Sequence, residues 1–175
     1  MFPAPKREKE SAFEFVQSTS ENGLVLSGVT NASKGSLEGF KSYGNPATGT
    51  AFVMYFQESQ LMSEDPTANP DWMTEIGGFL SGKSVKEVEG ESAYIVATST
   101  NDDNDTASFI KIDNTGETSW SKTYPAHGEI TDIALSYYNG KVDGYFLGGH
   151  VNSKTGALDG IITNLSKGGS IVWSE

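Results

Sequence analysis

Three tryptophans recur along this chain at a nearly regular spacing. Trp72, Trp120 and Trp173 lie 48 and 53 residues apart, and each falls near the end of a stretch that reads as four short strands. A recurrence of about 20–50 residues is typical of repeat architectures, in which each unit buries its apolar face against its neighbours. The spacing therefore predicts three copies of one β-unit.

The composition favours β-structure and excludes several kinds of partner. The 175 residues include 20 glycines and no cysteine, and the net charge is −11. An acidic chain lacks the basic patch that nucleic acids and anionic membranes require. A chain without cysteine has neither disulfides nor thiolate metal sites. No apolar run approaches the roughly 18 residues of a membrane span, and residues 1–10 show no signal-peptide core. We expect no nucleic-acid partner and no membrane insertion.

Three matching runs predict the second strand of each unit. Each has apolar residues, then a small residue, then a polar end with Asn, and they occupy residues 24–31, 94–101 and 145–152. Such a run is consistent with a strand that is buried on both faces. The small residue indicates that another backbone approaches closely.

The remaining strands follow from the same alignment of the three units. First strands are predicted at residues 12–16, 84–88 and 130–135, third strands at 51–56, 108–113 and 160–165, and Trp-bearing fourth strands at 72–76, 117–124 and 170–173. Residues 113–116 and 166–169 have the Asp, Asn, Ser and Gly content of tight hairpin turns. No segment keeps a helical period.

The sequence therefore predicts an all-β fold of β-propeller type, with three four-stranded antiparallel blades. Its divisions are an N-terminal extension (1–11), a first blade with two loop insertions (12–76), a second blade (77–124) and a third blade (125–175).

One stretch carries a resemblance to a known family. Phe109-Ile110-Lys111-Ile112-Asp113-Asn114-Thr115-Gly116, followed by Trp120-Ser121-Lys122-Thr123-Tyr124, resembles the repeat of microbial secreted and cell-surface β-propellers, whose units read FIIKxDxxGxxxWxKxY. The likeness spans most of residues 12–175, although the first unit departs from it with insertions and with Met73 after its Trp. It implies the propeller fold and an extracellular or cell-surface location, and it implies no particular activity.

The first unit is longer than the others because of two insertions, at residues 32–50 and 57–71. Insertions in repeat proteins map to loops and often to a binding face. We take Lys34, Phe40 and Tyr43 as candidate binding residues for a protein or glycan partner. The alternative interpretation is that a terminal repeat is simply atypical.

The number of units also constrains the assembly. Propellers typically have about 4–8 blades, so three do not close a ring, and an incomplete ring would leave unpaired strand edges. We expect either a longer propeller or self-assembly into a ring or filament.

A phosphate-loop pattern, G-x-x-x-x-G-K-S, spans residues 77–84. A nucleotide site would need a helix directly after it, whose N-terminal amides hold the phosphates. The following residues contain Gly90 and then a β-run, so we interpret the pattern as a connection between blades.

Residues 101–106 place oxygen ligands at alternate positions, as calcium loops do. Asn101, Asp103 and Asp105 are the candidate ligands for calcium. The loop lacks Gly at the sixth position and Glu at the twelfth, so a solvated acidic turn is the alternative.

Three sequons make Asn31, Asn104 and Asn164 candidate glycosylation sites.

His127 and His150 are interpreted as structural or exposed, because catalysis or metal binding needs convergent partners. The tryptophans are expected to pack between sheets, with sugar stacking as the alternative.

These features favour a non-enzymatic, extracellular or cell-surface module with a structural or adhesive role. The alternatives are a polysaccharide-acting hydrolase or lyase, whose paired carboxylates the sequence does not single out, and a lectin.

Overall fold

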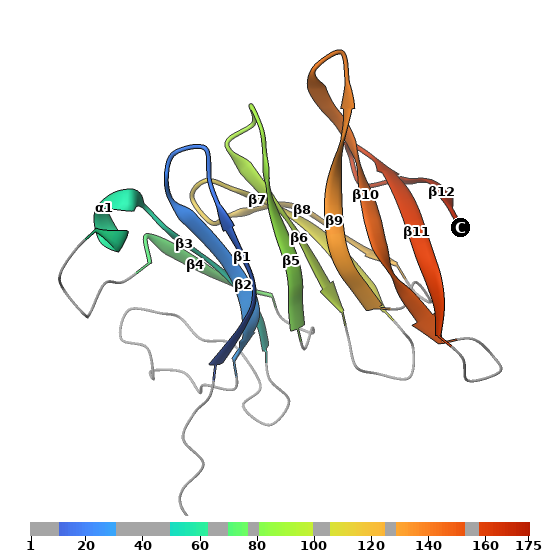
Figure 1. Ribbon diagram of the computed structural model, residues 1–175, viewed down its shortest axis with the longest axis horizontal. Helices are drawn as coiled ribbons and strands as arrows, with labels where there is room; N and C mark the ends of the chain where they lie inside the picture. The colour runs from blue at the N-terminus through green and yellow to red at the C-terminus, as the bar shows by residue number, and fades with distance from the viewer. Residues whose placement is uncertain are drawn as a thin grey trace, which may run out of the picture.

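The computed structural model describes residues 11–30, 50–62, 70–76, 81–99, 106–124, 129–152 and 158–175. In these ranges the chain forms three antiparallel sheets of four strands each and one short helix. Figure 1 shows the sheets side by side in chain order, from blue-green through green-yellow to orange-red. The predicted all-β fold and the three groups of four consecutive strands are confirmed.

Each sheet takes its strands in the order in which they occur along the chain. The first sheet contains β1 (Ser11–Ser18), β2 (Leu24–Thr30), β3 (Thr50–Phe56) and β4 (Trp72–Ile76). The second contains β5 (Ser81–Val88), β6 (Ala93–Ser99), β7 (Ala107–Asp113) and β8 (Thr118–Tyr124). The third contains β9 (Glu129–Tyr138), β10 (Lys141–Asn152), β11 (Leu158–Ser166) and β12 (Ile171–Ser174).

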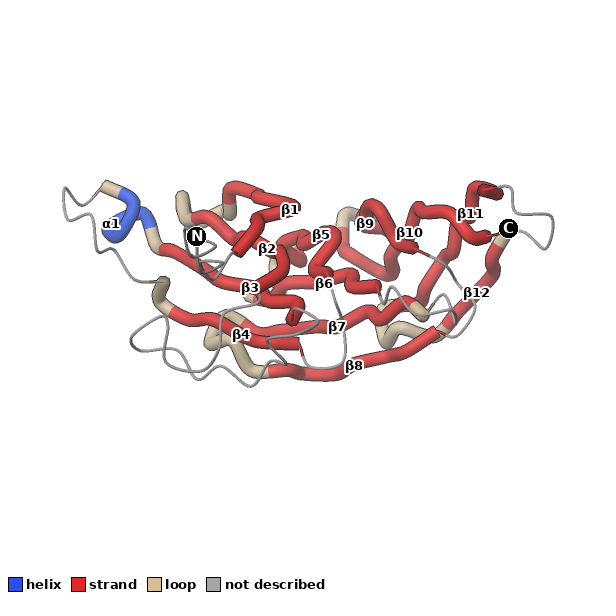
Figure 2. Tube along the Cα trace, turned by 90° about the horizontal axis from the view of Figure 1, so that it is seen from below, coloured by secondary structure: helices blue, strands red, loops and turns tan. Residues whose placement is uncertain are grey.

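The sheets stack face to face, so the second sheet is covered on both sides. Along β6, Val96 faces the first sheet and Ile95 faces the third, and both side chains are fully buried. This arrangement confirms the prediction of burial on both faces for β6, and it follows from the alternation of side chains along a strand. Figure 2 shows β1, β5 and β9 along one side of the stack and β4 and β8 along the opposite side.

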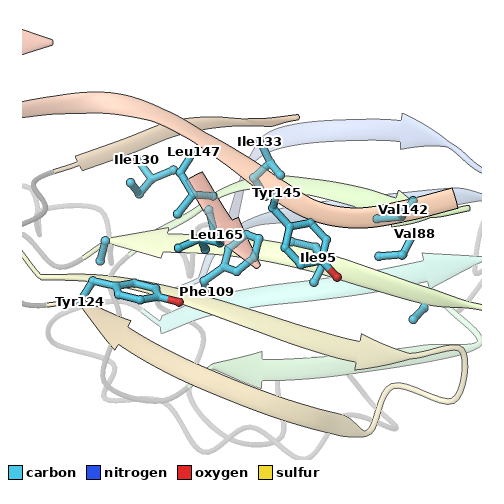
Figure 3. Close-up of a cluster of buried hydrophobic side chains, with 13 residues drawn as sticks. Val88, Ile95, Phe109, Tyr124, Ile130, Ile133, Val142, Tyr145, Leu147 and Leu165 are labelled. Carbon is cyan, nitrogen blue, oxygen red and sulfur yellow. The ribbon is translucent and has the colours of Figure 1, made fainter. Parts of the chain in front are cut away.

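Two apolar cores hold the stack together. The core between the first and second sheets contains Val25, Ala51, Val53, Tyr55, Ile76, Val85, Tyr94, Val96, Ile110 and Ile112. The core between the second and third sheets, drawn in Figure 3, contains Val88, Ala93, Ile95, Ala97, Ala107, Phe109, Tyr124, Ile130, Ile133, Val142, Tyr145, Leu147 and Leu165. Burial of apolar surface in these two layers is the main favourable contribution to folding.

Two elements differ from the expectations. The inserted segment 57–71 includes a single helical turn, α1 (Glu58–Leu61), which is too short for a helical period to reveal. In the third sheet, β9 and β10 run on into a longer hairpin through Asn139 and Gly140, with φ of 51° and 73°. Two central residues with positive φ are what an Asn-Gly hairpin turn requires, so the sequence contained this signal.

Candidate functional site

The most distinctive local arrangement is a joint between neighbouring sheets that is built around a tryptophan. Trp72 lies beside Tyr55 of its own sheet, with ring centroids 5.8 Å apart, and beside Tyr94 of the second sheet at 5.6 Å. Tyr55 and Tyr94 are themselves 5.8 Å apart. The three rings therefore form one cluster that links the first sheet to the second.

The second joint repeats the tryptophan and the incoming tyrosine of the first, but its third ring comes from a different register position, because Lys111 takes the place of Tyr55 opposite the tryptophan. Trp120 lies 5.8 Å from Phe109 of its own sheet and 6.5 Å from Tyr145 of the third sheet. Phe109 and Tyr145 meet edge to face at 5.2 Å, a favoured geometry for aromatic pairs. Trp72 and Trp120 thus pack between sheets, as predicted from the sequence.

A glycine turn of the next sheet lies under each of these tryptophans. Gly116 and Gly169 have φ of 87° and 77°, and a Cβ at either position would lie 3.1 Å from Trp72 or 2.9 Å from Trp120, respectively. Each turn also accepts a hydrogen bond through its glycine carbonyl. Thr74 Oγ1 donates to Gly116 O at 2.5 Å, and the Tyr124 hydroxyl donates to Gly169 O.

In both turns the side chain of the first residue accepts a hydrogen bond from the backbone N–H four residues further on. Asp113 Oδ1 accepts from the backbone N–H groups of Thr115 and Glu117, at 2.9 and 3.0 Å, and from the Thr115 hydroxyl at 2.6 Å. These bonds, led by that of the Thr115 side chain, hold the pKa of Asp113 below its ordinary value. In the third sheet Ser166 Oγ accepts from Ser170 N at 3.1 Å. The hairpin turns predicted at these two places are present.

Charged side chains also bridge the second and third sheets. Glu91 pairs with Lys111 of its own sheet and with Lys167 of the third, the latter at 2.5 Å. Partial burial raises the pKa of Glu91, but the hydrogen bonds and charges of the two lysines outweigh that effect and hold it below its ordinary value.

A second ionic bridge lies at the start of β9. Glu129 is 2.9 Å from Lys83 Nζ of the second sheet and 3.5 Å from His150 Nε2 of its own. Ser84 Oγ, which is fully buried, donates to Asp132 Oδ1 at 3.1 Å. His150 is half-buried beside a carboxylate that also pairs with Lys83 of the second sheet.

Two buried tyrosines at the second joint differ in the hydrogen bonding of their hydroxyl groups. Burial raises the pKa of both Tyr124 and Tyr145 to about 12. The Tyr124 hydroxyl has the Gly169 carbonyl as its acceptor, whereas the Tyr145 hydroxyl has no hydrogen-bond partner within the described part of the chain.

The third tryptophan lies on the face of the third sheet that points away from the second, where the described residues place no further sheet. Trp173 is 44% exposed and contacts Phe146 of its own sheet, with centroids 6.0 Å apart. Within the described residues Trp173 therefore contacts no second sheet, unlike Trp72 and Trp120. The register places Trp173 on one face with five other residues, and we call this set the open face: Ala134, Phe146, Gly148, Ile162, Asn164 and Trp173.

The third sheet, at the end of the stack, therefore exposes the open face to solvent. The expectation of unpaired strand edges at an open end does not distinguish that end, because each of the three sheets has two edge strands. Ile162, at 52% exposed, and Trp173 are the large apolar side chains of the open face that lie most in solvent.

The sequence-predicted site residues fall in two groups. Most lie outside the described residues: the calcium candidates Asn101, Asp103 and Asp105, the sequons of Asn31 and Asn104, the binding-loop candidates Lys34, Phe40 and Tyr43, and His127. Asn164 is described, and it lies half-buried in β11 between Phe146 and Trp173 in the register. The phosphate-loop pattern runs into β5 and not into a helix, in agreement with its interpretation as a connection.

Within the described ranges, no group of three or more His, Asp or Glu side chains could hold a metal ion. No helix in the described ranges is long and apolar enough to cross a membrane.

No protein-family model matches the chain, and no curated protein matches it in sequence. The interpretation of the site therefore rests on its own geometry.

Sequence reasoning missed the partners of the tryptophans. Tyr94 and Tyr145 occupy the same position in the aligned second strands, and Gly116 and Gly169 end the aligned turns. That shared alignment was the available signal. No local sequence signal indicated the ion pairs of Glu91, because its two lysines lie 20 and 76 residues away in the sequence.

Proposed function

We propose that this chain is a non-enzymatic structural module of β-propeller type, in which the three sheets act as blades. The observation that carries the proposal is the repeated joint. The same Trp–Tyr–Gly arrangement connects the first sheet to the second and the second to the third. Repeats of this kind gain stability chiefly from their interfaces with neighbouring repeats.

The charged groups support a structural role in preference to the hydrolase or lyase alternative. Glu91 lies between two lysines, and Glu129 lies between Lys83 and His150. A glycosidase needs two carboxylates facing one substrate bond, whereas these carboxylates face cations and connect sheets. The module would present its loops to a protein or glycan partner, or would assemble with further units. Its extracellular or cell-surface placement rests on the family resemblance alone.

Native mass tests this function. If the module assembles with copies of itself, light scattering coupled to size exclusion should give a mass above that of one 18.7 kDa chain, as a closed multimer or as a filament. If a different partner completes the stack, the chain alone should have the mass of a monomer and should bind that partner. A well-folded monomer with no tendency to associate, and with no affinity for added glycans or cell-surface proteins, would refute the proposal.

A lectin is the second candidate, and the exposure of Trp173 beside Phe146 favours it. Flat aromatic faces can stack on sugar rings, but Trp72 and Trp120 are committed to the joints. Titration with an oligosaccharide panel, followed by Trp fluorescence and repeated with Trp173→Ala, would detect such binding.

A further inference from the structure

The open face of the third sheet reproduces the faces that the first and second sheets use to receive their neighbours. Three register positions show this. Ser27 and Ala97 are fully buried small residues, and Gly148 takes their place in the third sheet. A Cβ added to Gly148 would meet no atom within 4 Å, so the space that a neighbouring sheet fills at Ser27 and Ala97 is empty here.

The apolar positions follow the same rule. Val53 and Phe109 face the next sheet, which covers them completely, so they are 0% accessible to solvent. Their counterpart Ile162 is 52% exposed. Ile95 is likewise 0% exposed, and Phe146 takes its place on the open face. Ile162 and Phe146 are therefore apolar residues at positions that the first and second sheets bury, but no sheet covers them in the described residues.

The two existing joints show which residues a sheet covering the open face would need. Each tryptophan contacts a tyrosine in the second strand of the incoming sheet, Tyr94 or Tyr145. Each also lies over a turn whose last residue is a glycine with positive φ, Gly116 or Gly169, where a Cβ would lie only 3.1 or 2.9 Å from the indole ring. A matching partner for Trp173 needs both features.

The first sheet of another copy of this chain lacks both. Leu24 stands where the second and third sheets have their tyrosine, and helix α1 with its flanking residues replaces the short glycine turn between third and fourth strands. In addition, Phe52 and Met54, on the far face of the first sheet, are already buried at 1% and 7% exposure. Head-to-tail stacking of copies is therefore disfavoured by this surface.

We infer that the open face receives a further four-stranded antiparallel sheet of the kind represented by the second and third sheets. That sheet carries a tyrosine at the register position of Tyr145 and a glycine turn at that of Gly169. The argument is continuity with an interface that the molecule already makes twice. This inference rests on the proposed function and adds to it the identity of the partner.

The test extends the full chain by a second copy of residues 125–175 after Glu175. The added copy carries Trp173→Phe, so that the original Trp173 lies in a unique peptide. Hydroxyl-radical footprinting with mass spectrometry then measures the labelling rate of Trp173, with Trp120 as an internal standard for a tryptophan at a filled joint. We expect the rate at Trp173 to fall to that of Trp120.

A matched control carries Tyr145→Ser and Gly169→Val in the added copy only, and Trp173 should then keep the labelling rate of the unextended chain. Hydrogen exchange of the second-sheet amides reports whether the original fold persists. If the second sheet stays protected while Trp173 is labelled as before, the inference is wrong. The same extension joined through a longer Gly/Ser linker repeats the test without the native connection, and labelling of Trp173 there as in the unextended chain also overturns it.

Other occupants give different results in the unextended chain. Protection of Trp173 together with a doubled native mass would show that a second copy covers the face, which overturns this inference and leaves the proposed assembly function standing. Protection on addition of an oligosaccharide would favour the lectin and also overturn it.

Discussion

The indole ring of Trp120 lies against the phenol ring of Tyr145 in the neighbouring sheet, with centroids 6.5 Å apart and planes inclined by 58°. Trp72 and Tyr94 hold the same relation at 5.6 Å and 56°. A contact that recurs with nearly the same inclination at two interfaces is a property of the repeat. Its contribution to stability can be measured by comparing Trp120 with Trp173, which lacks a tyrosine partner in the described residues.

Replacing Trp120 should destabilise the protein far more than replacing Trp173. We expect Trp120→Ala to lower the free energy of unfolding by about 3 kcal/mol, because it removes a large ring from a packed joint. Trp173→Ala should cost about 1 kcal/mol or less, since the ring is partly in solvent and contacts Phe146. Urea denaturation followed by circular dichroism measures both, and equal losses would contradict the assignment of Trp173 to an open face.

The two buried phenols offer a matched pair. Tyr124→Phe should lower the free energy of unfolding by about 1 kcal/mol, because the Gly169 carbonyl loses its hydrogen-bond donor. Tyr145→Phe should leave stability unchanged or slightly raised, because its hydroxyl is buried with no partner in the described residues. Thermal unfolding of the two variants at neutral pH decides the point, and a larger loss for Tyr145→Phe would show that its hydroxyl does have a partner.

Glycine substitutions separate backbone strain from the contact with tryptophan. Gly140 and Gly169 have similar φ, 73° and 77°, but only Gly169 lies under an indole ring. Gly140→Ala should cost about 1 kcal/mol, the usual penalty for a side chain in the left-handed region. Gly169→Ala should cost clearly more, because its Cβ would lie 2.9 Å from Trp120. Denaturant midpoints at constant slope provide the comparison, and equal midpoints would argue against a close joint.

Acid pH should weaken the bridge at Glu91. Its pKa is lowered in the folded state from an ordinary value of 4.5, so the unfolded chain takes up the proton first as pH falls. The contribution of Glu91 is therefore fully present above pH 4.5, and it is lost as pH falls through the folded-state pKa.

The variant Glu91→Gln tests this bridge directly. At pH 7 it should be less stable than the unmodified chain by about 2 kcal/mol, and this difference should shrink below pH 4.5. Glu117→Gln is the control, because Glu117 is exposed and should show no comparable effect at either pH. A difference for Glu91→Gln that stayed constant down to the acid limit would exclude the ionic explanation.

The strand pattern was predictable because it is local. Short apolar runs, Gly-containing turns and the recurrence of tryptophan all lie within short windows, and they located the strands of all three sheets to within a few residues. The Asn-Gly turn at Asn139 and Gly140 is an equally local signal. Loops 31–49 and 100–105, which carry most of the predicted site residues, lie outside the described residues.

The sequence by itself determined which residues form strands, how the strands group into three repeats and that each repeat carries one tryptophan. Only the tertiary structure decided what each tryptophan touches. Trp72, Trp120 and Trp173 occupy the same register position, yet two lie against a tyrosine of the next sheet and one lies on an open face. The physical reason is that burial depends on a neighbouring sheet, and contacts between sheets join residues far apart in the chain, such as Glu91 and Lys167, which no local pattern encodes.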